Sequence, residues 1–207
     1  TTGIFDGGGL AAGQYNFTYT VTSTMPCASD VANFTVTISN QETAGLDNLA
    51  LTLCNSAGSS IDLNPELSGN SIVGTWAETT AIVSGQLDAG TGIFDGGGLT
   101  AGQYNFTYTV NSTMPCASDV ALFEVSVTGV PNAAAGLDAD VCSFSYILGA
   151  TPSIGTGIWT GTGVTFSNAN SPTAAAAVTA AGSYTFTWTE DNGNGCVDSD
   201  NIVVQFS

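Results

Sequence analysis

The sequence predicts an all-β protein built of tandem antiparallel β-sandwiches with Greek-key connections. Thr, Val, Ile, Tyr and Phe alternate with polar residues in short stretches, a pattern typical of strands with one buried face. Clusters of Gly, Pro, Asn and Ser separate these stretches, and long runs of strong helix formers are absent. A sequence unit also recurs along the chain, which indicates repeated domains.

The repeat has a rear half and a front half. The rear half occupies 2–40 and 91–129, which align without a gap, and a diverged copy lies at 180–206. The front half opens with AGLDNLALTLC at 44–54 and with AGLDADVC at 135–142. Each opening is followed by a short apolar stretch and then by a Trp.

This arrangement predicts two complete domains, 41–129 and 130–207, preceded by the rear half of another at 1–40. The segment 1–40 contains two alternating stretches with one apolar face each, and an isolated hairpin of this kind is marginal in water. Its front half is therefore expected either to be missing from this sequence or to be supplied by another chain, as in donor-strand complementation.

The five cysteines follow the same repeat. Each complete unit has an early and a late Cys, which predicts the disulfides Cys54–Cys116 and Cys142–Cys196. Cys27 is the late Cys of the half unit, so we expect it to be unpaired or to form an intermolecular bond. Paired cysteines indicate an oxidising compartment, and buried free thiols are the alternative. Zinc is disfavoured because the chain has no His and no CxxC pair.

The charge balance narrows the classes of function. The chain has 17 acidic residues and no Lys, Arg or His. Nucleic-acid binding requires cations that neutralise phosphates, so we expect none. A Ser-His-Asp site is impossible without His, and the acidic residues form no specific pair of the kind that a glycosidase uses. We therefore expect no enzyme.

We expect neither a membrane-spanning segment nor a signal peptide in this sequence. No stretch approaches the roughly 18 consecutive apolar residues of a spanning helix, so we expect no membrane insertion. The first residues lack the charged and apolar segments of a signal peptide.

The motif TGIFDGGGL, at 2–10 and 91–99, has the glycines of a phosphate loop. A phosphate loop needs a following helix and usually a Lys, whereas here a turn and a strand follow. We expect Ile93 and Phe94 to belong to a core strand and Asp95–Gly98 to form a turn that uses glycines with positive φ.

Two further features indicate sandwich cores. The stretch LTAGQY at 99–104 resembles the tyrosine corner of Greek-key sandwiches, in which the Tyr104 hydroxyl would bond back to the main chain. Trp76 and Trp159 suit inward positions on a middle strand.

Four motifs mark the units: an AGxD…C opening, a central GxW, a GxYxFxxT strand at 102–109, and a late Cys followed by Asp. Together they resemble the tandem Ig-like or PKD-like repeats of large Bacteroidota surface proteins, including gliding-motility-type adhesins. The resemblance covers essentially the whole chain and implies Ig-like domains at the cell surface, without catalytic residues. It implies as partners copies of the chain itself or further repeats of the same polypeptide. The absence of Lys, Arg and His departs from the usual member.

The loop EDNGNGCVDSD at 190–200 is the strongest candidate for a metal site. Asp191, Asn194, Asp198 and Asp200 offer the oxygen ligands that calcium prefers, but their spacing lacks the regular pattern of an EF-hand. An ordinary solvated hairpin turn is the alternative. Three more acids, Asp47, Asp138 and Asp140, lie near domain junctions and are either calcium ligands or turn-forming residues.

Asn16 and Asn105 each begin an NFT sequence, the acceptor pattern for N-glycosylation. Both alternate with core-facing aromatic residues, so we expect their side chains to face solvent.

We therefore expect a structural segment of an extracellular filament or adhesin stalk built of disulfide-linked repeats. The alternative is a carbohydrate-binding or calcium-dependent adhesive module of a secreted protein. Exposed tryptophans on a shared face would favour carbohydrate binding.

Overall fold

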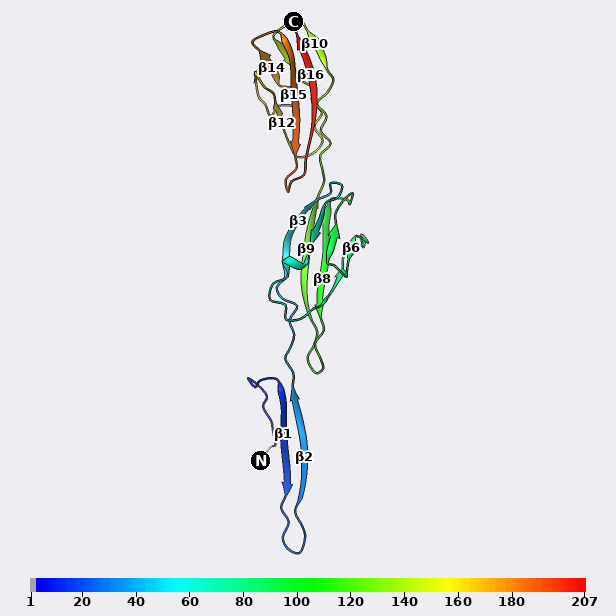
Figure 1. Ribbon diagram of the computed structural model, residues 1–207, viewed down its shortest axis with the longest axis vertical. Helices are drawn as coiled ribbons and strands as arrows, with labels where there is room; N and C mark the ends of the chain where they lie inside the picture. Colours follow the sequence, from blue (N-terminus) through cyan, green and yellow to red (C-terminus); the bar gives the residue numbers. More distant parts are fainter. Residues whose placement is uncertain (1–2) are drawn as a thin grey trace.

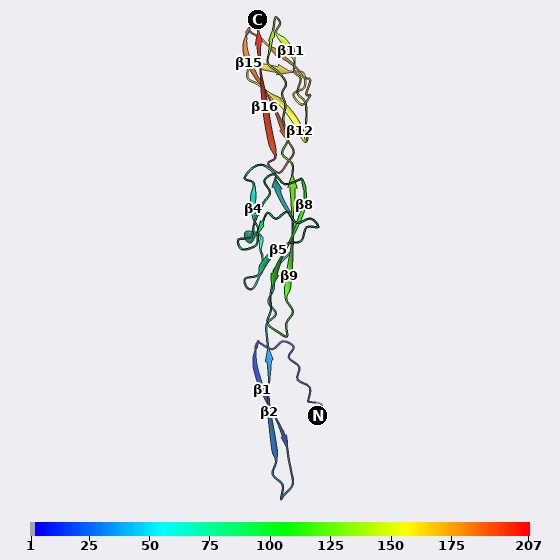
Figure 2. The same cartoon turned by 90° about the vertical axis from the view of Figure 1, so that its right-hand side faces the viewer.

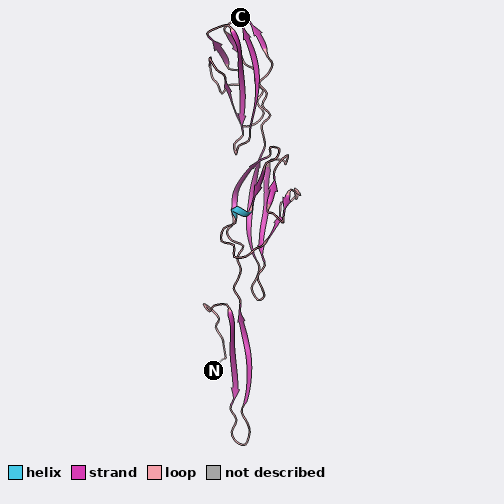
Figure 3. Cartoon of the chain, in the orientation of Figure 1, coloured by secondary structure: helices cyan, strands magenta, loops and turns pink. Residues whose placement is uncertain are grey.

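The computed structural model describes residues 3–207 as an elongated rod made of strands and one short 3-10 helix (Figures 1 and 3). A two-stranded hairpin, a central sandwich and a C-terminal sandwich follow one another along the long axis, and a view turned by 90° shows the same order (Figure 2). None of the described residues forms a helix long and apolar enough to cross a membrane.

The central sandwich has a four-stranded sheet and a three-stranded sheet. The first is ordered β3-β9-β8-β5 and the second β4-β7-β6. The bounds are β3 (Asn48–Cys54), β4 (Ser60–Asp62), β5 (Thr75–Glu78), β6 (Leu87–Asp88), β7 (Ile93–Asp95), β8 (Gly102–Val110) and β9 (Asp119–Thr128), with the 3-10 helix η1 at Asn64–Glu66.

The C-terminal sandwich repeats this connectivity, with sheets ordered β10-β16-β15-β12 and β11-β14-β13. The bounds are β10 (Ala139–Val141), β11 (Ser145–Ile147), β12 (Thr156–Thr160), β13 (Val164–Phe166), β14 (Ala175–Val178), β15 (Gly182–Asp191) and β16 (Val197–Phe206). The predicted fold class is therefore confirmed. In both sandwiches the first strand pairs parallel with the last strand, and the other pairs are antiparallel.

Every sheet draws its strands from one of the three predicted segments. The predicted boundaries at 40 and 129 themselves stay predictions.

Alternating residues fill the two cores, as the strand patterns predict. In β8, Phe106, Tyr108 and Val110 are buried, while Asn105 between them is exposed. Trp76 is buried in the central core, and both Trp159 and Trp188 are buried in the C-terminal core, which confirms the inward positions predicted for Trp76 and Trp159. The predicted middle strand is wrong, because β5 and β12, which carry Trp76 and Trp159, are edge strands of their sheets. Burying one such side chain contributes about 1.5–3 kcal/mol or more.

The tyrosine corner is also confirmed. The Tyr104 hydroxyl donates to the Thr100 carbonyl at 2.9 Å, and Tyr184 donates to Ala180 at 3.1 Å in the C-terminal sandwich. The same bond occurs in the hairpin, from Tyr15 to Ala11 at 2.9 Å.

The N-terminal hairpin has the strands of β8 and β9 without the rest of a sandwich. β1 (Gly13–Val21) pairs antiparallel with β2 (Asp30–Ile38). Tyr108 is 5% exposed in the central core, whereas the matching Tyr19 is 65% exposed. Phe123 is 1% exposed and the matching Phe34 is 52% exposed. Nearly the same sequence thus leaves its apolar face uncovered where strands equivalent to β3–β6 are absent.

Glu190 is the one buried charged side chain among residues 3–207, at 1% exposure. Its carboxylate accepts hydrogen bonds from the Ser153 amide at 3.1 Å and from the Trp188 indole at 2.8 Å, and also from the Ser153 hydroxyl. Burial alone would raise the pKa of Glu190, but these bonds and one from the Ile154 amide outweigh it and hold the pKa below its ordinary value.

The contact of β12 with Trp188 yields a test of the C-terminal core. A Cβ at Gly157 would overlap the Trp188 indole, so Gly157→Ala should lower the free energy of unfolding by about 1–3 kcal/mol or more. Gly149→Ala is the matched control, because its Cβ meets open space, and should change stability by less than about 0.5 kcal/mol. Urea unfolding followed by Trp fluorescence measures both, and equal stabilities of the two variants would contradict the packing.

The hydrogen-bonded Glu190 predicts a specific pH dependence. Glu190→Gln should lower the free energy of unfolding by about 1–3 kcal/mol near neutral pH, because a neutral amide replaces charge-assisted bonds. The folded pKa lies below the ordinary value of 4.5, so the carboxylate stabilises fully above that pH and loses its contribution as the pH falls through the folded pKa. The stability difference between wild type and variant should therefore shrink in acid. A difference that stays constant down to about pH 3 would contradict this account.

Candidate functional site

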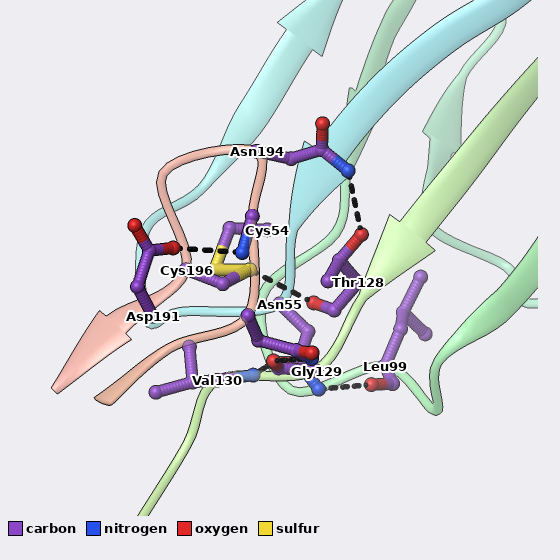
Figure 4. The surroundings of a disulfide bond; sticks show 11 residues. Cys54, Asn55, Leu99, Thr128, Gly129, Val130, Asp191, Asn194 and Cys196 are labelled. Carbon is purple, nitrogen blue, oxygen red and sulfur yellow. Dashed lines mark hydrogen bonds between the residues drawn. A yellow bond between two sulfur atoms is a disulfide. The ribbon is translucent and has the colours of Figure 1, made fainter. Parts of the chain in front are cut away.

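A disulfide between Cys54 and Cys196 joins the two sandwiches (Figure 4). Cys54 is the last residue of β3, and Cys196 closes the loop between β15 and β16. Their Cα atoms are 5.3 Å apart and their sequence separation is 142 residues. The bond therefore crosses from one predicted unit to the next.

The predicted pairs Cys54–Cys116 and Cys142–Cys196 are wrong. Cys116 is half-buried and unpaired, and Cys142 is exposed and unpaired. The reason is the parallel pairing of β3 with β9, which places Cys54 opposite Thr128 at the end of β9. Cys116 precedes the start of β9, and ten residues of strand span about 33 Å. An antiparallel first strand would have brought the end of β3 to the start of β9, where Cys116 lies.

The same geometry separates Cys142 from Cys196. β10 runs parallel to β16, and its last residue, Val141, lies opposite Phe206 at the end of that strand. Cys196 directly precedes β16, at its opposite end. Cys27 is exposed and has no disulfide partner within residues 3–207.

The β15–β16 loop presents amide side chains to the end of the central sandwich. Asn194 donates to the Thr128 hydroxyl at 3.0 Å, and Asn192 donates to the Gly129 carbonyl at 2.9 Å. The Sγ atom of Cys196 lies 3.2 Å from the Thr128 carbonyl oxygen. Asn194 adopts a left-handed φ of 52°, which is tolerated by Asn better than by most residues and fits a tight turn.

Asn55 completes the junction from the central side. Its amide nitrogen donates to Leu99 at 2.8 Å, and its side-chain oxygen accepts the Val130 main-chain N–H at 2.7 Å (Figure 4). Its own main-chain N–H donates to Thr128 at 2.9 Å. A single side chain thus ties the TGIFDGGGL turn to the segment that links the sandwiches.

The structure confirms the turn expected in this motif. Asp95 accepts the Gly97 N–H at 2.8 Å, Gly98 has a φ of 73°, and its N–H donates to the Asn55 carbonyl at 3.0 Å. Ile93 and Phe94 both lie in strand β7, as expected, with Phe94 fully buried in the core and Ile93 42% exposed. The motif is a structural turn beside the disulfide.

The proposed calcium ligands are engaged in separate hydrogen bonds. Asp191 caps its own loop by accepting the Gly193 N–H at 2.7 Å. Asp198 and Asp200 accept the N–H groups of Ala133 and Ala135 at 2.9 and 2.8 Å. Asn194 points to Thr128 instead. Over residues 3–207, no group of three or more His, Cys, Asp or Glu side chains is placed to hold a metal ion.

Other acids have the same role of holding the first segment of a sandwich against its last strand. Asp47 accepts the Leu122 N–H at 2.8 Å, and Asp138 accepts the Val203 N–H at 2.7 Å. Asp119 accepts from Ala44 and from the Thr43 hydroxyl, and these bonds, the Ala44 bond first, hold its pKa below the ordinary value. Calcium binding stays a prediction, also for Asp140.

The glycosylation candidates Asn16 and Asn105 are exposed, as expected from their alternation with aromatic residues. The Asn16 side chain accepts a hydrogen bond from Thr35 at 2.7 Å. Modification of either residue stays a prediction.

Sequence reasoning missed Asn55, Asn192 and Asn194 as junction residues. One signal was available, because the NGNGC stretch before Cys196 differs from the TMPC stretches before Cys27 and Cys116. The chemistry that this site can perform is thiol oxidation and disulfide reduction.

No family model matches the chain, and no curated protein matches its sequence. Solved structures match its fold. The eight N-terminal Ig domains of the Down syndrome cell adhesion molecule match 95% of this chain at 12% identity with a TM-score of 0.50, over 28% of that chain.

Two further matches have lower scores. Domains EC3–6 of protocadherin gammaB7 match 93% of this chain at 10% identity with a TM-score of 0.41, over 60% of that chain. The fibronectin(III)-like modules of Clostridium thermocellum CbhA match 77% of it at 13% identity with a TM-score of 0.38, over 90% of that chain. The chain spans less than two thirds of the protocadherin gammaB7 and Sidekick-1 structures. At such identities the likeness shows the fold alone, which is an Ig-like β-sandwich.

Proposed function

We propose that this chain is a non-catalytic, load-bearing segment of an extracellular filament or adhesin stalk. The observation that carries the proposal is the Cys54–Cys196 bond, which crosses the junction between two sandwiches. A disulfide that serves only the stability of one domain would lie within that domain.

The bond changes how tension passes along the rod. A pull on the two ends enters the central sandwich, crosses from Cys54 to Cys196 and leaves through β16. The residues between the two cysteines, most of both sandwiches, lie outside this covalent path. When the two termini of one chain are pulled, unfolding of either sandwich would therefore not extend that chain by its full length.

Hydrogen bonds around the disulfide also connect the two sandwiches at their junction. The bonds of Asn55, Asn192 and Asn194 cross or flank the short link at 128–130. The chain-entropy estimate for a loop of 142 residues is about 5 kcal/mol in favour of the folded state.

Composition supports a location outside the cell. Structural disulfides persist in oxidising compartments. The net charge of −17, without any cationic side chain, makes copies of this chain repel one another and favours their solubility. The sequence contains no His base and no Lys or Arg that could form a cationic clamp, which favours a non-catalytic role.

The alternative of carbohydrate binding depended on exposed tryptophans. Trp76, Trp159 and Trp188 are all buried, so no observation favours that alternative. A calcium-dependent adhesive module stays a prediction of the sequence. In the structure, the carboxylates of Asp198 and Asp200 accept main-chain hydrogen bonds.

Single-molecule pulling on the two ends tests the load-bearing role. The oxidised chain should extend by roughly 500 Å less than the chain treated with dithiothreitol, because the two cysteines are separated by 142 positions in the sequence and the chain between them lies outside the covalent path. Cys54→Ser combined with Cys196→Ser should restore the full extension without reductant.

Cys116→Ser is the matched control, since Cys116 forms no disulfide, and it should extend like the oxidised wild type. Equal extensions of the oxidised chain and the double variant would rule out this force path.

A further inference from the structure

The junction between the hairpin and the central sandwich repeats the disulfide-linked junction. Ile38 lies opposite Gly13 as Val127 lies opposite Gly102, so Ser39 and Thr128 occupy the same position after the last strand. The Cys116 thiol donates to the Ser39 carbonyl at 3.6 Å, just as Cys196 lies 3.2 Å from the Thr128 carbonyl. The loop of Cys116 also contacts the link, since Ser112 accepts the Glu42 N–H at 3.1 Å. A late cysteine thus lies against the end of the preceding unit at both junctions.

Cys142 and Cys54 occupy equivalent positions in their sandwiches. Cys54 lies at the junction, whereas Cys142 lies at the far end of the C-terminal sandwich. Cys54 ends the parallel first strand opposite Thr128, and Cys142 directly follows the parallel first strand beside Ser207. The Ser207 hydroxyl lies 3.6 Å from the Cys142 sulfur. Cys54 is paired with a late cysteine, whereas Cys142 is exposed and unpaired among the described residues.

The matching late cysteine is exposed at the opposite end of the rod. Cys27 lies in the loop between β1 and β2, which forms the end away from the C-terminus (Figures 1 and 2). This loop, 22–29, differs from the docked loop 111–118 only at its first residue, Thr22 in place of Asn111. It contains no charged residue, so it adds no charge repulsion when it approaches another copy of this acidic chain.

We propose that copies of this chain join head to tail through a disulfide between Cys142 of one copy and Cys27 of the next. This proposal rests on the load-bearing function proposed above, and the partner it assigns to the chain is a second copy of the same chain. The contact is heterologous, because different surfaces meet, so it extends into an open filament instead of closing a dimer.

The chemistry requires an oxidant. The two thiols lose two protons and two electrons as the S–S bond forms. A low-molecular-weight disulfide such as oxidised glutathione accepts them by thiol–disulfide exchange and leaves as two thiols.

The test uses the full chain with Cys116→Ser, which removes the third unpaired thiol. After incubation with oxidised glutathione, this variant should give a ladder of multimers on non-reducing gels, and the ladder should disappear with dithiothreitol. Adding either Cys27→Ser or Cys142→Ser should abolish the ladder. A mixture of these two double variants should give dimers and no larger species.

Mass spectrometry of endoproteinase Glu-C peptides identifies the bond. A Cys27–Cys142 peptide supports the proposal, whereas Cys27–Cys27 or Cys142–Cys142 peptides as the main products overturn it, as does the absence of multimers. Retention of the Cys54–Cys196 peptide in every variant shows that the fold is intact. If the reduced extension under load persists while no ladder forms, the head-to-tail link fails and the load-bearing function stands.

Discussion

The parallel pairing of the first strand with the last strand is the constraint on which the rest of the architecture depends. It carries the end of β3 to the end of β9, and the end of β10 to the end of β16. The early cysteine therefore lies at the end of the sandwich where the last strand finishes. The late cysteine of the same unit lies at the opposite end, out of reach. Pairing with the next unit is the geometry that remains, and Cys54–Cys196 forms in that way.

The hairpin shows what one half of such a unit lacks. Its strands keep the antiparallel register and the Tyr15 corner of the complete units. Phe5 packs against Tyr15 and Phe17 with centroid distances of 5.9 and 4.8 Å, as Phe94 packs against Tyr104 and Phe106. Local sequence therefore specifies this half, while burial of its apolar face needs strands equivalent to β3–β6.

The sequence predicted the fold class, the tyrosine corner at Tyr104 and the buried Trp76 and Trp159, because each depends on periodicity or on a local motif. It did not predict the disulfide pairing. That pairing depends on the direction of the first strand in the sheet, and AGLDNLALTLC has the same alternation in either direction. The junction bonds of Asn55 and Asn192 were equally hidden, since they join residues far apart along the chain.

The central claim is that a disulfide links successive units, and disulfide mapping of oxidised, unreduced protein tests it most directly. Digestion without reduction, followed by mass spectrometry, should yield a linked peptide pair that contains Cys54 and Cys196. A linked pair that contains Cys54 and Cys116 would contradict the account.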